Sequence, residues 1–414
     1  MEGLQAVRRR VAGIDVHRML HVVTAVVEQA DGSIEETSRE FGGFKRDCRA
    51  LSAWLAGLGI ELAVMESTGI YWKSLHSHLE RAGIEVWVVN AHHVKHVPGR
   101  KTDMNDSQWL AVLARFGLVR GSFIPPQDFC ELRSLSRYRR KVSTMHASEV
   151  NRLHKILDDG GVKLGAVVSN VNGVSAREMV AGLIKGTGID ALLDMARGKL
   201  KLKRDDLQEA LDGDLSARHL FILKHIHAHI DMLERELAEI DAYILAAMEP
   251  YAWAHRLLQT IPGIDQIASA LILIETGVDM TQFGSAQRLA SWASLCPGNN
   301  ESAGKRKSGR TGRNNGVIRY ILCECANAAR NTKSSLAAKY RSLKVRKSHK
   351  KTIVALAHKM IRIIYVMLSR KEAYHDPQTD YAAISAKKNA PRWIKQLREI
   401  GKWPDVKRAA TASA

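Results

Sequence analysis

The order of apolar segments in the first 116 residues constrains the fold of this chain more than any other feature. Residues 11–27 read as two β-strands that meet at a turn over residues 17–19, and a third strand follows the Asp31-Gly32 turn. Helices and short buried strands then alternate, over residues 44–57, 61–66, 71–82, 84–89 and 102–116. Three successive strands followed by alternating helices and strands predict a mixed α/β domain built on one sheet.

Four carboxylates fall where such a sheet would bring them together. Asp15 interrupts an otherwise apolar strand, where an unpaired buried charge would be costly. Glu66 ends the next parallel strand, where open α/β sheets place their ligands. Asp103 and Asp106 are three residues apart on the third expected helix, which Thr102 or Asp103 would cap, so they face the same way. The four oxygen donors together suit Mg²⁺ or Mn²⁺, although each alone is explained as a cap, a strand end or a solvated charge.

The net charge predicts a polyanionic partner. Lys and Arg number 62 against 43 Asp and Glu, which leaves a formal charge of +19. The excess is spread over several segments, so we expect a basic folded surface that binds nucleic acid and not a membrane. Backbone contacts are expected from Arg100 and Lys101 beside the carboxylates, and from Arg137 and Arg140 on a basic helix after residue 126. A solvated helix face is the alternative for the second pair.

Targeting and cysteine usage favour a cytoplasmic protein. The first residues contain arginines but no apolar run before a small-residue cleavage site, and no stretch reaches the roughly 18 apolar residues of a membrane span. The cysteines are odd in number and scattered, so we expect reduced thiols without a zinc site or a disulfide framework. They are Cys48, Cys130, Cys296, Cys323 and Cys325.

The middle of the chain, residues 126–250, is expected to be helical and basic. Apolar residues there alternate at spacings of three and four over about three heptads, which predicts a coiled-coil seam. The seam could pair two chains, making a dimer or higher oligomer, or it could belong to one helix of an intramolecular bundle, and the sequence does not choose. Its residues are Leu223, Ile226, Ile230, Leu233, Leu237, Ile240 and Ile244.

Residues 251–385 are expected to form a further helical domain, followed by a basic and partly disordered tail over residues 386–414. The string I-P-G-I-D-Q-I-A is similar to a helix-hairpin-helix motif, in which Gly263 and the following helix N-terminus offer backbone N–H groups to a DNA phosphate. An ordinary helical turn is the alternative.

A glycine-rich basic loop is expected over residues 297–316. It holds five glycines, five Lys or Arg residues and one carboxylate, Glu301. Gly and Asn tolerate positive φ, so backbone N–H groups can converge on an anion, and the cations would bind phosphate oxygens. A hydroxyl beside such a phosphate, from Ser302, Ser308 or Thr311, is a candidate nucleophile, whereas a solvated flexible loop is the alternative. The cations are Lys305, Arg306, Lys307, Arg310 and Arg313.

Taken in order, these motifs resemble one family over residues 11 to about 375. The strings G-I-D-V, E-S-T-G-I-Y and T-D-x-x-D are followed far downstream by the Pro-Gly hairpin and by P-G-N-N-E-S-A-G-K-R-K. This combination resembles the DEDD-type transposases of insertion-sequence family 110, its 1111 branch and the related Piv-type DNA invertases. The resemblance implies a RuvC-like, ribonuclease-H-like metal domain over residues 1–125, then the helical coiled-coil region and a C-terminal transposase domain.

The resemblance also implies a mechanism. Its members are recombinases that a structured RNA, the bridge or seeker RNA, guides to donor and target double-stranded DNA. By resemblance, Asp15, Glu66, Asp103 and Asp106 would hold Mg²⁺. Ser302 would attack the scissile phosphate and form a covalent phosphoserine, and Ser308 and Thr311 do not match the motif. The carboxylates of one protomer would meet the serine of another, in a dimer that becomes a tetramer in the synaptic complex.

Three other functions remain open on the sequence. A RuvC-type nuclease or resolvase would hydrolyse DNA with metal-activated water, and Ser302 would only contact phosphate. A hydrolytic DDE transposase would leave free 3′-hydroxyl ends and no protein–DNA adduct. A non-catalytic nucleic-acid-binding protein would use the carboxylates structurally.

Overall fold

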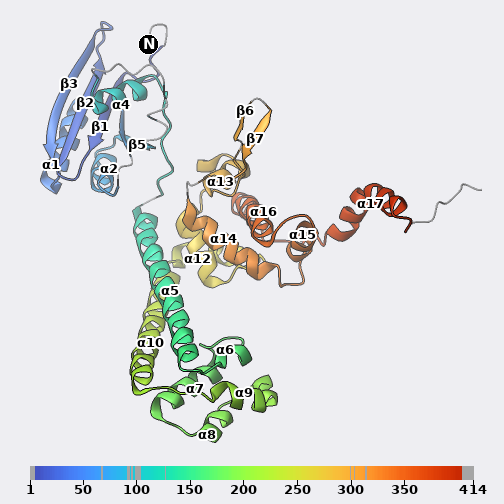
Figure 1. Ribbon diagram of the computed structural model, residues 1–414. Helices are drawn as coiled ribbons and strands as arrows, with labels where there is room; N and C mark the ends of the chain where they lie inside the picture. Colours follow the sequence, from blue (N-terminus) through green and yellow to red (C-terminus); the bar gives the residue numbers. More distant parts are fainter. Residues whose placement is uncertain are drawn as a thin grey trace, which may run out of the picture. The chain divides into compact units, whose positions relative to one another are not determined.

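The computed structural model describes residues 5–66, 69–90, 94, 97, 104–125, 127–298, 300–302, 304–312 and 315–402. The chain divides into two compact units, Met1–Gln127 and Asp128–Ala414. The first unit is α/β with a five-stranded sheet, and the second is mostly helical (Figure 1). The finer division expected near residues 250 and 385 stays a prediction.

The sheet of the first unit has the strand order β3-β2-β1-β4-β5. The first three strands form an antiparallel meander, and β4 and β5 run parallel to β1, as the sequence order predicted. The strands are β1 Arg10–Val16, β2 Leu20–Glu28, β3 Ile34–Gly42, β4 Leu62–Glu66 and β5 Glu85–Val89. Within the described residues, the helices of this unit are α1 Lys45–Gly57, α2 Trp72–Arg81 and α4 Asp106–Arg115.

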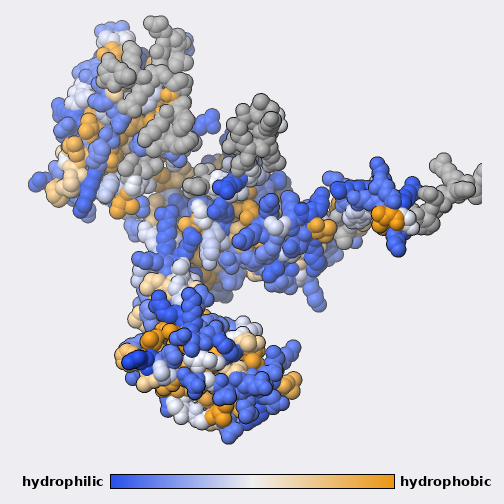
Figure 2. All heavy atoms as spheres, in the orientation of Figure 1, coloured by the Kyte–Doolittle hydropathy of each residue, from blue (hydrophilic) through white to orange (hydrophobic). Residues whose placement is uncertain are grey.

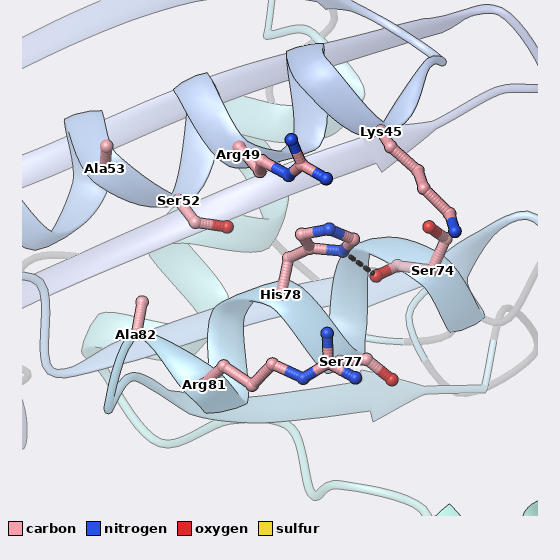
Figure 3. Close-up of a pocket in the computed structure, with 9 residues that line it drawn as sticks. All are labelled: Lys45, Arg49, Ser52, Ala53, Ser74, Ser77, His78, Arg81 and Ala82. Carbon is pink, nitrogen blue, oxygen red and sulfur yellow. Dashed lines mark hydrogen bonds between the residues drawn. The ribbon is translucent and has the colours of Figure 1, made fainter.

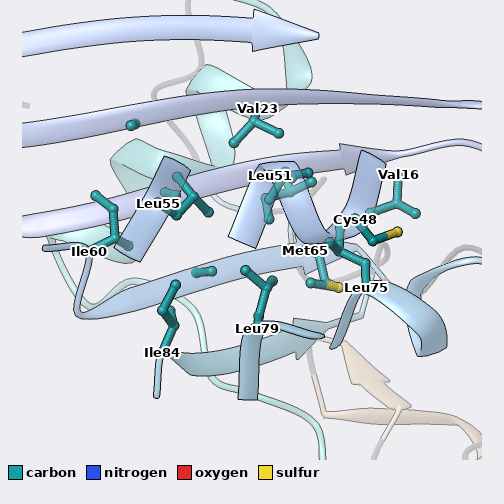
Figure 4. Packing of buried hydrophobic residues seen from close by; sticks show 14 of the residues in the cluster. Val16, Val23, Cys48, Leu51, Leu55, Ile60, Met65, Leu75, Leu79 and Ile84 are labelled. Carbon is teal, nitrogen blue, oxygen red and sulfur yellow. The ribbon is translucent and has the colours of Figure 1, made fainter. Parts of the chain in front are cut away.

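Helices cover both faces of this sheet, so β1 and β4 are buried on both sides. Helices α1 and α2 pack on one face, where Leu51 and Leu79 meet Ile14 and Met65 (Figure 4). Helix α4 packs on the other face, against Val11, Leu62 and Val64. Because side chains alternate along a strand, odd-numbered β1 residues and even-numbered β4 residues face α4.

The second unit begins with a helical hairpin and continues as a compact helical body. Its first helices are α5 Gln127–Asp159, α6 Leu164–Val167, α7 Val174–Lys185, α8 Ile189–Asp194, α9 Arg204–Leu211 and α10 Ala217–Ala246, with the 3₁₀ helix η1 Gly198–Lys203. The body holds α11 Ala252–Gln259, α12 Gln266–Thr276, α13 Ala286–Trp292, α14 Gly316–Ala329, α15 Ser335–Lys344, α16 His349–Arg370 and α17 Tyr381–Glu399.

The heptad seam of α10 is buried inside its own chain. Leu223, Ile226 and Ile230 belong to one core with Leu153 and Leu157 of α5. Polar bonds continue the pairing of the two helices, from Arg139 to Asp241, from Tyr138 to Glu236 and from His146 to Glu234. The intramolecular alternative therefore accounts for the seam without a second chain. The heptad pattern therefore gives no evidence for self-association, which stays a prediction.

Helix α16 explains the most apolar part of the chain. By length and composition alone it could cross a membrane, but half of its most apolar window is buried. It packs against α11, α13, α14 and α15, so its hydropathy is that of a core helix. On the visible surface, apolar residues are scattered among hydrophilic ones (Figure 2).

The tail expected from residue 386 is in part a helix. Helix α17 runs from Tyr381 to Glu399 and includes Pro391, so residues 386–399 of the tail are helical. Trp393, Leu397 and Ile400 recur at helical spacing, and this pattern outweighed the basic composition. Residues 403–414 lie outside the described part of the chain.

Candidate functional site

Asp15 and Glu66 lie at neighbouring positions on one edge of the sheet. Strands β1 and β4 pair in parallel with Ile14 opposite Met65. Asp15 is the next residue after Ile14 in β1, and Glu66 is the next residue after Met65 in β4. Both belong to the set of alternating positions that faces α4. Strand register and face therefore place these two residues beside each other, whereas their role as metal ligands stays a prediction.

Asp106 is the first residue of α4, which begins later than expected. The N-cap is Asn105, whose Oδ1 accepts the N–H of Gln108 at 2.8 Å. The Gln108 side chain accepts the Asn105 N–H at 3.0 Å, which completes a capping box. The predicted cap at Thr102 or Asp103 was thus wrong, because the reciprocal pair of Asn105 and Gln108 fixes the helix start. Asp103 lies outside the described residues, as do Arg100 and Lys101.

Close packing holds the start of α4 on the carboxylate edge. A Cβ at Gly13 would come within 2.0 Å of the Ser107 carbonyl oxygen and 2.4 Å of the Ala111 nitrogen, so only glycine permits this approach. The buried Ser107 hydroxyl is 2.7 Å from Thr24 Oγ1, which is in turn 2.9 Å from Ser38 Oγ. This chain of hydroxyls ties the first turn of α4 to β2 and β3. Asp106 is thereby held near the ends of β1 and β4.

The donor chemistry of the edge fits a hard divalent cation. Asp15, Glu66 and Asp106 offer carboxylate oxygens, which Mg²⁺ and Mn²⁺ prefer. In the described part of the chain, no three His, Cys, Asp or Glu side chains are grouped closely enough to hold a metal ion. Instead, His17 Nε2 donates to Asp15 Oδ2 at 3.0 Å. Asp15 thus bonds to a histidine that sequence reasoning did not assign, and metal binding by the three carboxylates stays a prediction.

The predicted basic loop is a short β-hairpin. Strand β6, Asn300–Ser302, pairs antiparallel with β7, Lys305–Ser308, and Ser302 is opposite Lys305. Gly304 takes φ +72° at the turn, a conformation that favours glycine. Backbone pairing across this turn explains why the segment is not irregular. Ser302 is the last residue of β6, directly before the turn region.

The predicted cations of this segment lie on the hairpin strand and its flank. Lys305, Arg306 and Lys307 are all in β7. Arg310 is exposed, and its carbonyl oxygen accepts the Gly298 N–H at 2.9 Å. Arg313 lies outside the described residues. Three of the four described cations therefore follow Ser302 along one strand, and Arg310 lies just after that strand.

The base of the hairpin is fixed by contacts that the sequence did not reveal. Arg319 Nη1 donates to Thr311 Oγ1 at 2.9 Å, and the Asn315 N–H donates to Ser294 Oγ at 3.2 Å. The Asn315 side chain caps α14, because its Oδ1 accepts the N–H groups of Val317 and Ile318.

Asn315 also donates to a fully buried glutamate. Its Nδ2 lies 2.9 Å from Glu275 Oε2, and Arg133 Nε approaches the same oxygen at 3.6 Å. Arg133 donates to the backbone carbonyls of Ile274 and Glu275 as well. Helices α5, α12 and α14 therefore meet at one polar cluster directly after the hairpin. The only sequence signal was a glutamate ending the apolar run of α12, and it was missed.

Arg137 and Arg140 line a basic pocket of about 540 Å³. Lys141 and Arg152 of α5 add two further cations, and the single carboxylate is Glu149, which pairs with Arg152 at 2.7 Å. The Arg140 guanidinium lies over the Tyr320 ring of α14 at 4.7 Å. These contacts support the predicted backbone-binding role, because the pocket carries an excess of positive charge.

Gly263 has a packing role that motif reasoning did not foresee. It takes φ +88° in the turn between α11 and α12, and a Cβ there would come within 2.6 Å of the Cys325 carbonyl oxygen in α14. The turn is thus pressed against α14, which by itself requires a glycine. Phosphate binding at Gly263 stays a prediction.

Comparison with sequence families agrees with this order of parts. A family model described as Transposase, of the DEDD type from IS110 elements, matches residues 12–160. A second, described as Transposase IS116/IS110/IS902 family, matches residues 255–341, and the two together span more than half of the chain. This chain belongs to the IS110 family of DEDD transposases. The first match contains β4 and α4, and the second contains the serine hairpin, defined as β6, β7 and the turn between them.

Relatives of this transposase match different shares of it. The transposase for insertion sequence element IS1111A of Coxiella burnetii is 23% identical over 77% of this chain and 81% of that protein. An uncharacterized 42 kDa protein of insertion element IS900 from Mycobacterium paratuberculosis is 30% identical, over 39% of this chain and 41% of that protein. A solved structure of Thermus thermophilus RuvC aligns with 27% of this chain and 99% of its own, at 14% identity and a TM-score of 0.22. A score this low carries no argument.

Proposed function

We propose that this transposase cuts and rejoins donor and target double-stranded DNA through a covalent phosphoserine at Ser302. Asp15, Glu66, Asp103 and Asp106 are assigned to hold Mg²⁺, or Mn²⁺ in its place. A structured guide RNA selects the DNA sites, and the active form is a homo-oligomer in the cytoplasm. Membership of the IS110 family supports DNA as the substrate.

The observation that carries the proposal is the shared edge of Asp15 and Glu66. These two carboxylates lie near the carboxyl ends of adjacent parallel strands, on the face that α4 covers, and so offer oxygen donors from neighbouring positions to one cation. Asp106 brings a third negative charge to the first turn of α4. Three sets of carboxylate oxygens on neighbouring elements supply the donor type that a divalent cation prefers, which supports the metal assignment.

A bound Mg²⁺ would supply Lewis-acid stabilisation of charge on the phosphate oxygens. The chain's own residues do the remaining work. Asp15, Glu66 and Asp106 orient the ion from rigid elements, since strand register and the Gly13 contact fix their backbones. Lys305, Arg306 and Lys307 on β7 hold non-bridging phosphate oxygens and so position the backbone beside Ser302.

Ser302 carries the transfer step. Its Oγ loses a proton and forms a bond to phosphorus, while the bond from phosphorus to a DNA oxygen breaks and that oxygen takes up a proton. One phosphate ester thereby replaces another, so rejoining by a DNA hydroxyl needs no ATP. The turn that contains Gly304 leaves Ser302 at the end of a short ladder, opposite Lys305.

The guide RNA is proposed from the excess of positive charge. The charge of +19 and the pocket around Arg137 and Arg140 provide more positive surface than one DNA contact needs. Delegating sequence choice to base pairing is consistent with phosphate-directed contacts alone.

The test is a covalent-adduct assay with the full-length protein. Nicked, end-labelled DNA is incubated with Mg²⁺ and RNA transcribed from the element's flanks, and label that stays on protein after boiling in SDS is measured. Ser302→Ala should abolish the adduct, whereas Ser308→Ala, a hydroxyl deletion on β7 of the same hairpin, should retain it. Asp15→Asn should abolish both cleavage and adduct, with Asp31→Asn in the exposed β2–β3 turn as its control.

Two outcomes would contradict the proposal in different ways. Cleavage without an adduct, unaffected by Ser302→Ala, would establish metal-dependent hydrolysis of the RuvC type and reduce Ser302 to a phosphate contact. Cleavage that survives Asp15→Asn would remove the metal site from the mechanism.

A further inference from the structure

A second basic pocket lies in the first unit, between α1 and α2. Its volume is about 610 Å³, and its lining comes from these two helices alone. Lys45 and Arg49 project from α1 toward the side chains of α2, and Arg81 projects from the end of α2 (Figure 3). The remaining lining is three serines, one histidine and two alanines, with no carboxylate among them.

The cations of this pocket have no partners in the described part of the chain. No hydrogen bond or ion pair engages Lys45, Arg49 or Arg81, although nearby acids exist on the same helices. Asp47 accepts from the Phe44 N–H at 3.1 Å, and Glu80 pairs with His76 at 3.1 Å. Three permanent positive charges therefore share one cavity without internal compensation, which favours an external anion.

The neutral groups of the pocket suit the same ligand. His78 Nδ1 donates to the Ser74 carbonyl at 2.7 Å, so Nε2 of the same ring points away from that carbonyl. Ser52 and Ser77 add hydroxyl groups, and Ser52 Oγ is anchored on the Cys48 carbonyl at 2.8 Å. Sites for small apolar ligands are lined mainly by hydrophobic and aromatic side chains, which this pocket lacks. Arginine forks and hydroxyls bind phosphate oxygens.

The pocket is separate from the carboxylate edge. Helices α1 and α2 pack on the face of the sheet that includes Ile14 and Met65. The alternation that directs Asp15 and Glu66 toward α4 therefore places them on the opposite face. A polymer bound between α1 and α2 is held on a different side of this unit from the strand at the carboxylates.

We propose that the α1–α2 pocket binds the phosphodiester backbone of a nucleic-acid segment, with Arg49 and Arg81 as its main phosphate contacts. The contact is independent of base sequence, because contacts to phosphate oxygens carry no sequence information. It does not depend on Ser302 or on the carboxylates being catalytic.

The test measures salt-dependent binding of full-length protein without Mg²⁺ to two labelled 20-base-pair probes, an RNA duplex and a DNA duplex of matching sequence. The slope of log K against log salt is negative, and each lost phosphate contact lowers its magnitude by about 1. Arg49→Gln/Arg81→Gln should therefore lower it by about 2. Arg49→Lys/Arg81→Lys keeps the charge and should keep the slope.

The matched control is Arg9→Gln/Arg120→Gln, which removes two exposed charges of the same unit outside the pocket. A lower slope with RNA alone or DNA alone identifies the strand that the pocket holds, and a lower slope with both assigns it to backbone in general. An unchanged slope with both probes overturns the proposal. An equal fall in the control pair also overturns it, because the effect is then that of net charge alone.

Discussion

The carboxylate edge and the serine hairpin are built in opposite ways. Asp15 and Glu66 end strands that are paired on both sides within a five-stranded sheet and covered by helices on both faces. Ser302 ends a strand that pairs only with β7, over three residue pairs. An isolated two-stranded ladder is marginally stable in water, so the hairpin relies on contacts at its base. The carboxylate edge is thus stabilised by the packed sheet and its helices, and the hairpin by the polar contacts at its base.

This difference teaches where each half of the proposed chemistry is vulnerable. Damage to the edge should come from packing changes beneath it, at Gly13 or in the first turn of α4. Damage to the hairpin should come from the polar cluster of Asn315, Glu275 and Arg133, far from Ser302 along the chain. Predictions follow from this contrast in order of expected size.

The largest effect is expected from Gly13→Ala. The new methyl group would meet the backbone of α4 at 2.0 Å, and neither strand nor helix can yield without losing pairs. Overpacking of this kind costs roughly 3 kcal/mol, and hydrogen exchange of α4 should accelerate accordingly. The matched control is Gly57→Ala in α1, where nothing lies within 4 Å of the added Cβ and about 0.5–1 kcal/mol should be gained. Equal protection of α4 in both variants would contradict the packing argument.

Asn315→Ala should loosen the hairpin's anchor. The α14 cap is lost and Glu275 Oε2 loses its 2.9 Å donor, at a combined cost of about 2 kcal/mol. Amide exchange in the first turn of α14 should then be roughly 30-fold faster, since each 1.4 kcal/mol is tenfold. Ser334→Ala removes the cap of α15 in the same unit and should leave α14 unaffected. Unchanged exchange at α14 would show that the cluster does not hold the anchor.

The stability of the first unit should fall on mild acidification. Burial lowers the pKa of His76 from its usual 6.5, although Glu80 opposes the shift. Below pH 6.5 the unfolded chain therefore binds a proton that the folded chain resists, so stability is highest above that pH and declines as pH falls toward the lowered pKa. The melting temperature measured at pH 7.5 and 5.5 should differ less in His76→Gln than in the parent. An identical difference in both proteins would sink this assignment.

The smallest effect concerns Cys325, on the buried side of α14. Burial raises the pKa of its thiol to about 12, so almost no thiolate exists at pH 8. Iodoacetamide should leave Cys325 unlabelled in the folded protein and label it in urea, as peptide mass spectrometry would detect. Faster labelling in Asn315→Ala than in Ser334→Ala would link the hairpin's anchor to the packing of α14. Rapid labelling of the parent would show that α14 opens readily.

The sheet was predictable because its signals are local and periodic. Apolar runs and a turn signal located the strands, and period-two geometry puts Asp15 and Glu66 on one face. The start of α4 was misplaced by a few residues because T-D-M-N-D offers several eligible caps. The deciding feature was the reciprocal bond between Asn105 and Gln108, three residues apart.

The anchor of the hairpin was not predictable, because it joins residues far apart in sequence. Nothing local to Glu275 indicates that its carboxylate is buried against Arg133 and Asn315. Likewise, the heptad pattern of α10 announced a buried seam but not which helix covers it. Only the paired core with Leu153 and Leu157 of α5 answers that question.

The paired helices α5 and α10 also set a length scale. At 1.5 Å per residue, the 33 residues of α5 extend about 50 Å. Helices α6 to α9 are carried between the far ends of this pair (Figure 1). A B-form duplex advances about 34 Å per turn, so the arm is roughly one and a half turns of DNA long. Removing one heptad from each of α5 and α10 would shorten the helix pair by about 10 Å and move helices α6 to α9 by that distance along its axis.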